Sequence, residues 1–544
     1  MHNHTAGSVI ALCAVLLAGT AACSSSDGDS KTATGKPVSG GTLTYALTQE
    51  PDCLDPAVSP MQATAIVNRN IFDSLVSLDS DGKFHPALAE KWAVSPDGTT
   101  YTFTLKKGVV FHDGTPFDAT AVKATLDHVV DPKTKSYYAA SLISVYRGAK
   151  VVDASTVEVK IAAPTAPFLQ ALSTAYLGIQ SPKALTRDAA QQCQSPVGTG
   201  PFQVSAWEKK SSIKLTRNPA YAWAPPTAGH TGPALLDGLT FQFIPENSAR
   251  LGALTSGQVN GVDGVQPADV AQVKGSGSLQ LLRADSPGTA YSLYLNAKKA
   301  PFSDEKVRIA FQRSLNLDVL IKSVYFGQYA RAWSPLSPTT LGYDPSTVGT
   351  WAYDPTLSNK LLDEAGWATR DSEGYRTKDG KRLSLYWPYT PLFATDSRTI
   401  LGQGIQADAK KVGIDLKYTS VDVGQLQKDV LTGASDLYST SYVRAEPDIL
   451  RFFFASDQTA DKGGGNAFHF SAPDVDGWLK AATGSSDDAV RKTNYANVQK
   501  YVLEHALVVP TYVPSYLAGV SKKVHDVKFD PSAYPVFYDA WLEH

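Results

Sequence analysis

The sequence predicts an α/β protein with more than one domain, and three observations lead to that class. Short stretches alternate polar and apolar residues, as half-buried strands do. Other segments carry apolar residues at helical spacing, and the succession of helix and strand favours α/β layers. The chain has 544 residues, more than one hydrophobic core normally serves, so we expect two or three domains.

The strand pattern is clearest in the first half of the chain. Each stretch places apolar side chains at every second position, which puts them on one face of a strand. We therefore predict strands at Thr42–Leu47, Tyr101–Leu105, Val157–Ile161 and Leu239–Phe243.

Helical spacing is clearest from residue 303 onward. Ser303 is a suitable N-cap, and Asp304 and Glu305 suit the positive end of the helix dipole. Apolar residues from Val307 to Val324 then line one face. The spacing predicts a helix that begins at Ser303 and continues to about Val324.

Two further helices have recognisable ends. Asp354 can cap a helix with Pro355 at its first position, and Gly366 can end it. A later helix is predicted to stop near Gly413, followed by a strand over Ile414–Tyr418.

The N-terminus has the pattern of an exported lipoprotein. Residues 1–22 contain no charged side chain, and their apolar core, Val9–Ala18, is short for a membrane span. The segment ends in GTAAC, which predicts cleavage before Cys23 and a lipid on that cysteine. Thr20 and the uncharged first residues depart from the usual pattern, so a plain export signal is the alternative. Residues 23–40 are rich in Ser, Gly and Thr and predict a flexible tether.

Two cysteines remain in the mature body, Cys53 and Cys193. An exported chain meets an oxidising compartment, where such a pair is expected to form a disulfide. Closing a loop of about 140 residues stabilises the fold by roughly 4 to 5 kcal/mol in the chain-entropy description. Two unrelated buried thiols are the alternative.

Several function classes find little support in the residues. The net charge is −2 and there is no basic block, which argues against nucleic-acid binding. The ten histidines are scattered without metal-site spacing, so we expect neither a metal site nor another cofactor. The sequence contains no G-x-S-x-G or H-E-x-x-H motif. We therefore expect a protein that is not an enzyme, and a secreted hydrolase is only a remote alternative.

Five segments in order carry a family resemblance: GGTLTYALTQEPDCLDP, the stretch from IFDSLVSLDSDGKFHPALAEKW to HDGTPFDATAV, SPVGTGPFQV with KLTRNPAY, YLNAKKAPFSDEKVRIAFQRSLN and YDPTLSNKLLDEAGW. With these motifs the chain resembles the family 5 extracellular solute-binding proteins of ABC importers, the peptide- and nickel-binding group. The likeness extends from about Gly40 to Phe537.

The resemblance implies a periplasmic-binding-protein-like fold of type II with three lobes. Lobe I would comprise residues 41–73, 196–290 and 511–544, and lobe II would be an insertion over residues 74–195. Lobe III would run over residues 291–510, and the solute would be held between lobes I and III. A bridge between Cys53 and Cys193 would lie beside the junction of lobes I and II.

Gly198 and Gly200 flank the point where the family's chain re-enters lobe I, between two prolines. Alternating flexible and rigid residues suit a hinge, so we predict a hinge role for both glycines. An ordinary turn between strands is the alternative.

The segment STSYVRAEPDIL, residues 439–450, is the main candidate for ligand contact. Family members that bind oligopeptides carry an amine-binding Asp four residues before the proline, where this chain has Val443. Arg444 follows and favours a carboxylate or phosphate. Glu446 or Asp448 can instead accept an amine, or these charges neutralise one another around a helix start over Ile449–Phe454.

Other candidates come from family position, with core packing as the alternative for each. In all, the predicted ligand-binding residues are Tyr442, Arg444, Glu446, Asp448, Ser59, Gln62, Trp333, Trp387, Tyr389 and Phe393.

These expectations combine into one functional prediction. The protein captures a peptide or peptide-like solute outside the cell and delivers it to a membrane permease and its ATPase. A carrier of an oligosaccharide, opine-like compound or metal chelate is the alternative, and a surface receptor is a further one. We expect a monomer.

Overall fold

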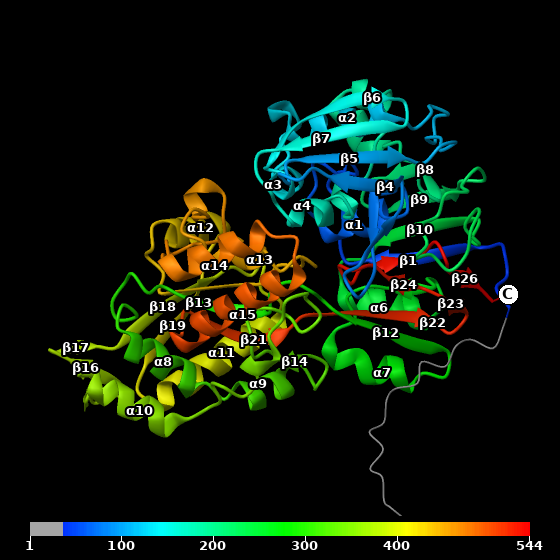
Figure 1. Ribbon diagram of the computed structural model, residues 1–544. Helices are drawn as coiled ribbons and strands as arrows, with labels where there is room; N and C mark the ends of the chain where they lie inside the picture. The colour runs from blue at the N-terminus through cyan, green and yellow to red at the C-terminus, as the bar shows by residue number, and fades with distance from the viewer. Residues whose placement is uncertain (1–35, 544) are drawn as a thin grey trace, which may run out of the picture. The chain divides into compact units, whose positions relative to one another are not determined.

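The computed structural model describes residues 36–543 and contains three main sheets, around which Figure 1 shows the helices gathered. We call the parts built on these sheets lobes I, II and III, after the predicted lobes. Residues from Pro37 onward form one unit by their internal contacts. The predicted signal (1–22), Cys23 and most of the tether lie outside the described residues.

Lobe I is built on a seven-stranded sheet that joins both ends of the chain. Its strand order is β12-β22-β11-β1-β10-β9-β8, with β1 parallel to β10 and β11. The early strand β1 and the late strand β22 therefore belong to the same sheet (Figure 1). The strands are β1 (Thr42–Leu47), β8 (Phe202–Glu208), β9 (Ser212–Arg217), β10 (Gly238–Phe243), β11 (Gly261–Val262), β12 (Leu279–Asp285) and β22 (Ser515–Ser521). The helices are α1 (Gln62–Asn68), α6 (Asn247–Thr255) and α7 (Val270–Gly275), and the C-terminal strands are β23 (Val524–His525), β24 (Lys528–Phe529), β25 (Pro535–Val536) and β26 (Trp541–Leu542).

Lobe II is an antiparallel four-stranded sheet in the order β4-β5-β7-β6. The Asp118 carboxylate caps the helix α2 by accepting from the backbone N–H groups of Thr120 and Ala121. The elements are β2 (Val76–Leu78), β3 (Phe84–Pro86), β4 (Ala89–Val94), β5 (Thr100–Leu105), β6 (Tyr146–Asp153), β7 (Thr156–Ile161), α2 (Ala119–Val130), α3 (Tyr138–Leu142), α4 (Pro167–Ala171) and α5 (Ala189–Gln194).

Lobe III has its own four-stranded sheet, β14-β21-β13-β20, and a parallel pair formed by β18 and β19. Its strands are β13 (Tyr291–Leu295), β14 (Ala330–Arg331), β15 (Thr369–Arg370), β16 (Arg376–Lys378), β17 (Lys381–Arg382), β18 (Ser384–Tyr389), β19 (Asp415–Ser420), β20 (Leu437–Thr440) and β21 (Val508–Val513). Its helices are α8 (Glu305–Ser314), α9 (Leu317–Val324), α10 (Pro355–Glu364), α11 (Asp396–Lys411), α12 (Val423–Leu431), α13 (Ile449–Phe454), α14 (Pro473–Thr483) and α15 (Asp488–Glu504).

The distribution of the apolar core divides the molecule into two bodies. One continuous core joins buried residues of lobe I, such as Tyr45 and Phe241, to residues of lobe II, such as Phe103. Lobe III has a separate core that includes Leu293 and Phe311. Because interiors are close-packed and resist deformation, lobes I and II are expected to move together relative to lobe III.

The four predicted strands of the first half are confirmed as β1, β5, β7 and β10. Asp354 caps α10 by accepting from the Leu357 N–H, and Gly366 follows the helix with φ +86°, as predicted. Gly413 likewise has φ +91° between α11 and β19.

The single helix predicted from Ser303 is wrong in two respects. The N-cap is Asp304, whose carboxylate accepts from the Lys306 N–H. The helix also breaks into α8 and α9, because Leu315 adopts an extended conformation and the Asn316 N–H donates to the distant carboxylate of Asp408 at 2.9 Å. The apolar stripe continues across this break, which is why periodicity alone did not reveal it.

The predicted disulfide between Cys53 and Cys193 is confirmed. Its two segments are also joined by a hydrogen bond from the Leu54 N–H to the Cys193 carbonyl at 2.9 Å. Gly198 and Gly200 lie in this region, where an added Cβ would approach the Ile71 backbone within 2.1 and 2.5 Å. Glycine is therefore required there for close backbone approach, and the hinge role of both residues stays a prediction.

Candidate functional site

The candidate site lies at the seam where the chain crosses between lobe I and lobe III. The chain leaves lobe I after β12 through residues 286–290 and returns through residues 513–515, before β22. The two crossings are adjacent, since the Ser286 N–H donates to the Pro514 carbonyl at 2.8 Å. Side chains beside these crossings therefore lie near both bodies.

The segment 439–450 is attached directly to the first crossing. Val443 forms an antiparallel bridge with Gly288, and the Thr289 N–H donates to the Tyr442 carbonyl at 2.9 Å. Gly288 has φ +100°, and a Cβ there would lie 2.1 Å from the Tyr442 carbonyl oxygen. This position therefore needs glycine, and the approach that glycine permits brings Tyr442 and Arg444 to the seam.

Arg444 is a cation with few protein partners. Its guanidinium lies 5.7 Å from the ring centre of Tyr138 in α3, across the contact between lobes III and II. The Nε atom is buried without a hydrogen-bond partner, and no described carboxylate lies within ion-pair distance. Beside it, Tyr442 remains 37% exposed and packs against Phe452 and Phe453.

Glu446 and Asp448 have protein partners instead. Glu446 is 5% exposed and forms an ion pair with Arg491 of α15. The Asp448 carboxylate accepts from the Thr483 hydroxyl at 2.6 Å and from the Tyr495 hydroxyl at 2.9 Å. Burial raises the pKa of both carboxyl groups. An amine-binding role for either acid stays a prediction, but the hydrogen-bonding capacity described is used inside lobe III.

The Asp448 network also borders lobe II. The carbonyl of Thr483 accepts from the Ala166 N–H, just before α4, at 2.9 Å. Lobe III therefore contacts lobe II directly through main-chain atoms, in addition to the contact of Arg444 with Tyr138.

The remaining predicted residues are dispersed. Trp387 is 1% exposed and its indole donates to Ser439 at 3.3 Å, whereas Phe393 is 59% exposed. Tyr389 stacks on Tyr418, and Trp333 packs edge-on against Trp351. Ser59 is buried within lobe I, where its hydroxyl bonds to Thr64, and Gln62 begins α1. Their roles in ligand contact stay predictions.

Sequence reasoning missed Arg398, in the first turn of α11. Its guanidinium lies 4.6 Å from the ring centre of Tyr291, and its Nε donates to the Tyr512 hydroxyl at 2.9 Å. Its Nη1 donates to the Phe393 carbonyl at 2.9 Å. Among the described residues no carboxylate forms an ion pair with Arg398. Burial by itself lowers the pKa of Arg398, but the neighbouring phenols of Tyr512 and Tyr291 outweigh it and raise the pKa.

Arg398 lies in a group of tyrosines that we call the tyrosine box, formed by Tyr291, Tyr325, Tyr329 and Tyr512. The rings of the other three lie 4.5 to 5.4 Å from that of Tyr512. Tyr329 also packs against the core cluster of lobe I around α6 and α7. The box therefore belongs to the seam.

A signal for Arg398 is present in the sequence. It is the only basic residue between Arg382 and Lys410. A cation is unfavourable at a helix N-terminus, where the dipole favours an anion. A lone arginine in the first turn of a helix is therefore a candidate for ligand contact.

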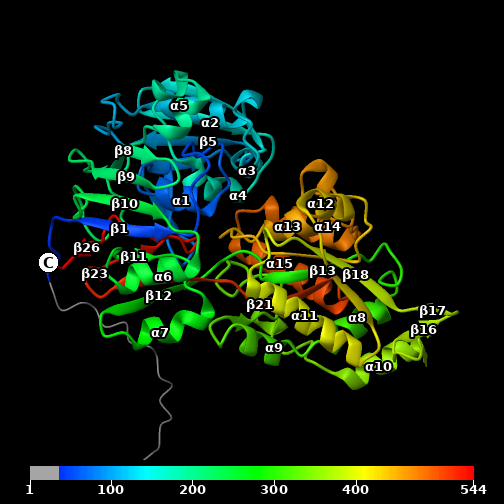
Figure 2. The same cartoon turned by 180° about the vertical axis from the view of Figure 1, so that it is seen from behind.

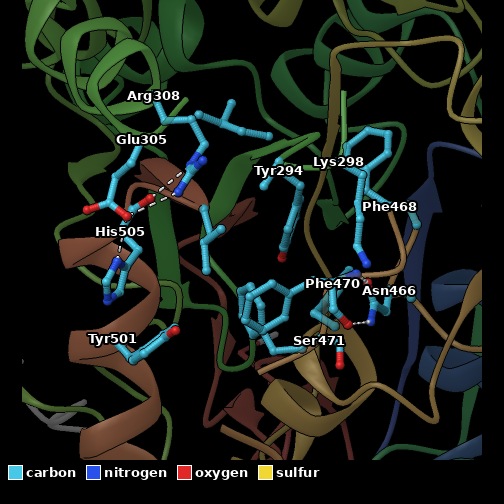
Figure 3. Close-up of a pocket in the computed structure, with 17 residues that line it drawn as sticks. Tyr294, Lys298, Glu305, Arg308, Asn466, Phe468, Phe470, Ser471, Tyr501 and His505 are labelled. Atoms are coloured by element: carbon cyan, nitrogen blue, oxygen red, sulfur yellow. Dashed lines mark hydrogen bonds and ion pairs between the residues drawn. The ribbon is translucent and has the colours of Figure 1, made fainter. Parts of the chain in front are cut away.

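Two cavities lie elsewhere. One of about 350 Å³ lies inside lobe III, between β13, α13, α15 and residues 465–471 (Figure 3). In its lining, Glu305 pairs with His505 at 2.8 Å and with Arg308 at 3.5 Å, and Lys298 is a further charged group. The other, of about 550 Å³, lies between lobes I and II and includes the Arg69–Asp530 ion pair. No predicted ligand residue lines either cavity.

Two features are absent from the described residues. No cluster of three or more His, Cys, Asp or Glu side chains in residues 36–543 is arranged to hold a metal ion. Within the same range, no helix combines the length and apolar character needed to cross a membrane.

Two bodies joined by adjacent crossings, with cations and aromatic rings at the seam, define a type II periplasmic binding protein. Solved structures with the same fold include DppA from Helicobacter pylori in complex with the peptide STSA and NikA from Brucella suis in complex with Fe(III)-EDTA. The first has a TM-score of 0.76 at 25% identity and covers 93% of this chain and 99% of its own. The second has a TM-score of 0.81 at 25% identity and covers 92% and 100%.

Sequence comparison gives the family. Residues 83–464 match the bacterial extracellular solute-binding proteins, family 5 Middle, and the chain belongs to this family. A curated relative, the glutathione-binding protein GsiB of Salmonella choleraesuis (strain SC-B67), is 28% identical over 500 residues, which cover 90% of this chain and 92% of that protein. The predicted family and fold are thereby confirmed, as is a role as the extracytoplasmic solute-binding component of an ABC importer.

Proposed function

We propose that this protein captures a peptide-like solute between lobes I and III and delivers it to an ABC permease and its ATPase. The observation that carries the proposal is the seam, where Arg444, Arg398 and the tyrosine box surround the two crossings. The relatives named as binding glutathione and a peptide support a peptide-like cargo.

Closure follows from the division into two bodies. A solute that contacts lobe III and lobe I together stabilises only the conformation in which both surfaces meet it. The crossings at 286–290 and 513–515 are the backbone segments that must absorb this motion. Solute binding thereby shifts the equilibrium toward the closed conformation, and a permease can distinguish the closed conformation from the open one.

Native mass spectrometry of freshly purified protein is the most direct test, followed by thermal unfolding with a panel of short peptides. Bound solute at a hundredfold excess over its Kd stabilises a protein by about 2.7 kcal/mol, so a cognate peptide should raise the Tm clearly. Small-angle scattering should show compaction with the same peptide. Absence of a retained solute, of any thermal shift and of compaction would contradict the proposal.

Anchoring by a lipid on Cys23 is part of the proposal. A single diacylated, N-terminally modified cysteine can hold the body at the extracytoplasmic face of the membrane. Labelling with a fatty acid should mark the wild-type chain and leave Cys23→Ala unmarked. An unlabelled wild-type chain recovered in the soluble fraction would favour a plain export signal. The same preparation run by size exclusion tests the proposed monomer.

A non-peptide solute is the second candidate. The observation that favours it is the Fe(III)-EDTA complex of NikA, a fold neighbour at 25% identity whose ligand is a metal chelate. A chelate brings its own ligands to the metal and presents carboxylates to the protein. Guanidinium groups at the seam suit it as well as a peptide.

A further inference from the structure

On the basis of the proposed solute-binding role, we infer that the solute carries two anionic groups, one bound by Arg398 and the other by Arg444. The ligand class is a short peptide-like molecule with two carboxylates. The acidic side chains named above at the seam already have partners within lobe III: Glu446 pairs with Arg491, and Asp448 accepts from two hydroxyls.

The other arginines of lobe III set these two apart. Five pair with a carboxylate: Arg308, Arg376, Arg382, Arg451 and Arg491. Three donate to two or more backbone carbonyls: Arg313, Arg331 and Arg370. Arg398 has one phenol and one carbonyl, and the Arg444 guanidinium has no hydrogen bond to any described residue.

A partly buried guanidinium without a counter-ion is costly unless a ligand supplies the charge. A carboxylate is the natural partner because it can accept two parallel N–H bonds from the planar group. The aromatic faces of Tyr291 and Tyr138 hold the two guanidiniums in place and shield them from solvent. The sites are therefore prepared for an anion before one binds.

The acidic side chains at the seam already interact with other side chains of the protein. Asp285, at the end of β12, pairs with Arg283 at 2.9 Å and accepts from the Ser515 hydroxyl at 2.5 Å. Glu446 and Asp448 have the partners described above. An amine bound at the seam would therefore compete with these protein partners, whereas an anion would meet two guanidiniums that have no described carboxylate.

The two arginine sites attach to the backbone close together along the first crossing and the start of β13. Arg444 is fixed at residues 287–288, since its N–H donates to the Pro287 carbonyl at 3.3 Å, and Arg398 stacks on Tyr291. Three residues of extended chain span about 10 Å. An extended tripeptide has about the same length, so a solute of this size matches the separation of the two attachment points.

The surrounding elements indicate how such a solute would lie. Arg444 faces lobe II through its contact with Tyr138 of α3, whereas Arg398 belongs to α11. Both ribbon views place α13 nearer than α11 to α3 and α4 (Figure 1, Figure 2). The solute would extend along the seam from α11 toward α3, with Tyr442 between its ends. Lobe II would then contribute Tyr138 to the site.

A matched series of ligands tests the inference with the wild-type protein. The probes are the N-acetylated tripeptide Glu-Ala-Gly, its Gln-Ala-Gly analogue and the Gln-Ala-Gly amide, which carry two, one and no carboxylates. Calorimetric titration should show affinity falling about tenfold or more at each step, the usual effect of losing a buried charge-assisted bond. Equal affinity across the series, or tighter binding of a cationic tripeptide, would overturn the inference.

Variants locate each contact. Arg398→Gln and Arg444→Gln should each weaken the two-carboxylate probe about tenfold or more. Each variant should lose little further affinity when the matching carboxylate is already absent, because the two changes remove the same contact. Arg451→Gln is the control, since that arginine pairs with the exposed Asp457 away from the seam. Losses that are the same for every probe would indicate altered folding and would contradict specific contacts.

Failure of the inference is distinguishable from failure of the proposed function. A neutral or cationic solute that is retained or added, and that stabilises and compacts the protein, would support the proposed function. The same result would contradict the inference that the solute carries two carboxylates. A protein that retains no solute and responds to no member of the panel contradicts both.

Discussion

Arg444 and Glu446 are separated by one residue, yet their charges meet opposite environments. Glu446 is buried against Arg491, so its charge is compensated within lobe III. Arg444 reaches the contact with lobe II, 5.7 Å from the Tyr138 ring centre, and pairs with no carboxylate of residues 36–543. Under the proposed function, one short segment therefore serves stability at its helix end and ligand binding at its strand end. Substitutions at the two ends should therefore differ in their effect on the stability of the protein.

The largest effect is expected from Arg491→Ala. Removing this arginine leaves Glu446 buried without a counter-charge, and breaking a buried ion pair typically costs about 3 kcal/mol or more. Denaturant unfolding of the solute-free protein should therefore show a markedly lower midpoint.

Arg451→Ala provides the matched control, because its partner Asp457 is 61% exposed. An exposed pair contributes less than about 1 kcal/mol. Similar denaturant midpoints for Arg491→Ala and Arg451→Ala would show that the buried Glu446–Arg491 pair contributes no more to stability than an exposed ion pair.

The helix end of the segment 439–450 also shows what the sequence alone could not predict. The helix Ile449–Phe454 was predictable from Pro447 and the apolar run, and it appears with those bounds. The partners of Glu446 and Asp448 were not, because Arg491, Thr483 and Tyr495 come from other helices. A local pattern can place a charge at a helix start, but it cannot say which distant side chain compensates that charge.

The surroundings of Arg398 and the seam could not be predicted for the same reason, because they are formed by residues distant in the sequence. Local signals located α10, with its cap at Asp354, and the disulfide followed from the cysteine count. The aromatic neighbours of Arg398 come from residues 291 and 512, which only the sheet of lobe III brings together. Family position predicted Trp387 as a contact, and the fold buries it to 1% exposure.

A smaller effect is expected from Asp448→Ala. The change removes the acceptor of the Tyr495 hydroxyl and one of the two acceptors of the Thr483 hydroxyl, and such a loss costs about 1 to 3 kcal/mol. Because the Thr483 carbonyl meets the Ala166 N–H, hydrogen exchange at residue 166 should also rise. Unchanged unfolding and unchanged exchange would show that this network does not support the contact with lobe II.

Asp448→Asn is the control, since it keeps an oxygen acceptor and removes the charge. Burial raises the pKa of Asp448 above its ordinary value of 3.8, so the folded state holds the proton more tightly than the unfolded chain does. Its contribution to stability is therefore complete below pH 3.8 and is lost as the pH rises through the raised pKa. In Asp448→Asn the free energy of unfolding should depend less on pH over this range. A pH dependence equal to that of the wild type would contradict the prediction.

The smallest effect on stability is expected at the other end of the segment, from Arg444→Met. No described carboxylate depends on Arg444, and methionine can keep the contact with the Tyr138 ring. Unfolding of the solute-free variant should lie within about 1 kcal/mol of wild type, with a gain in stability where the buried Nε had no partner. Affinity for the two-carboxylate probe should nevertheless fall. A residue that lowers affinity without lowering stability belongs to the binding surface, whereas a loss of stability like that of Arg491→Ala would assign Arg444 to the interior network instead.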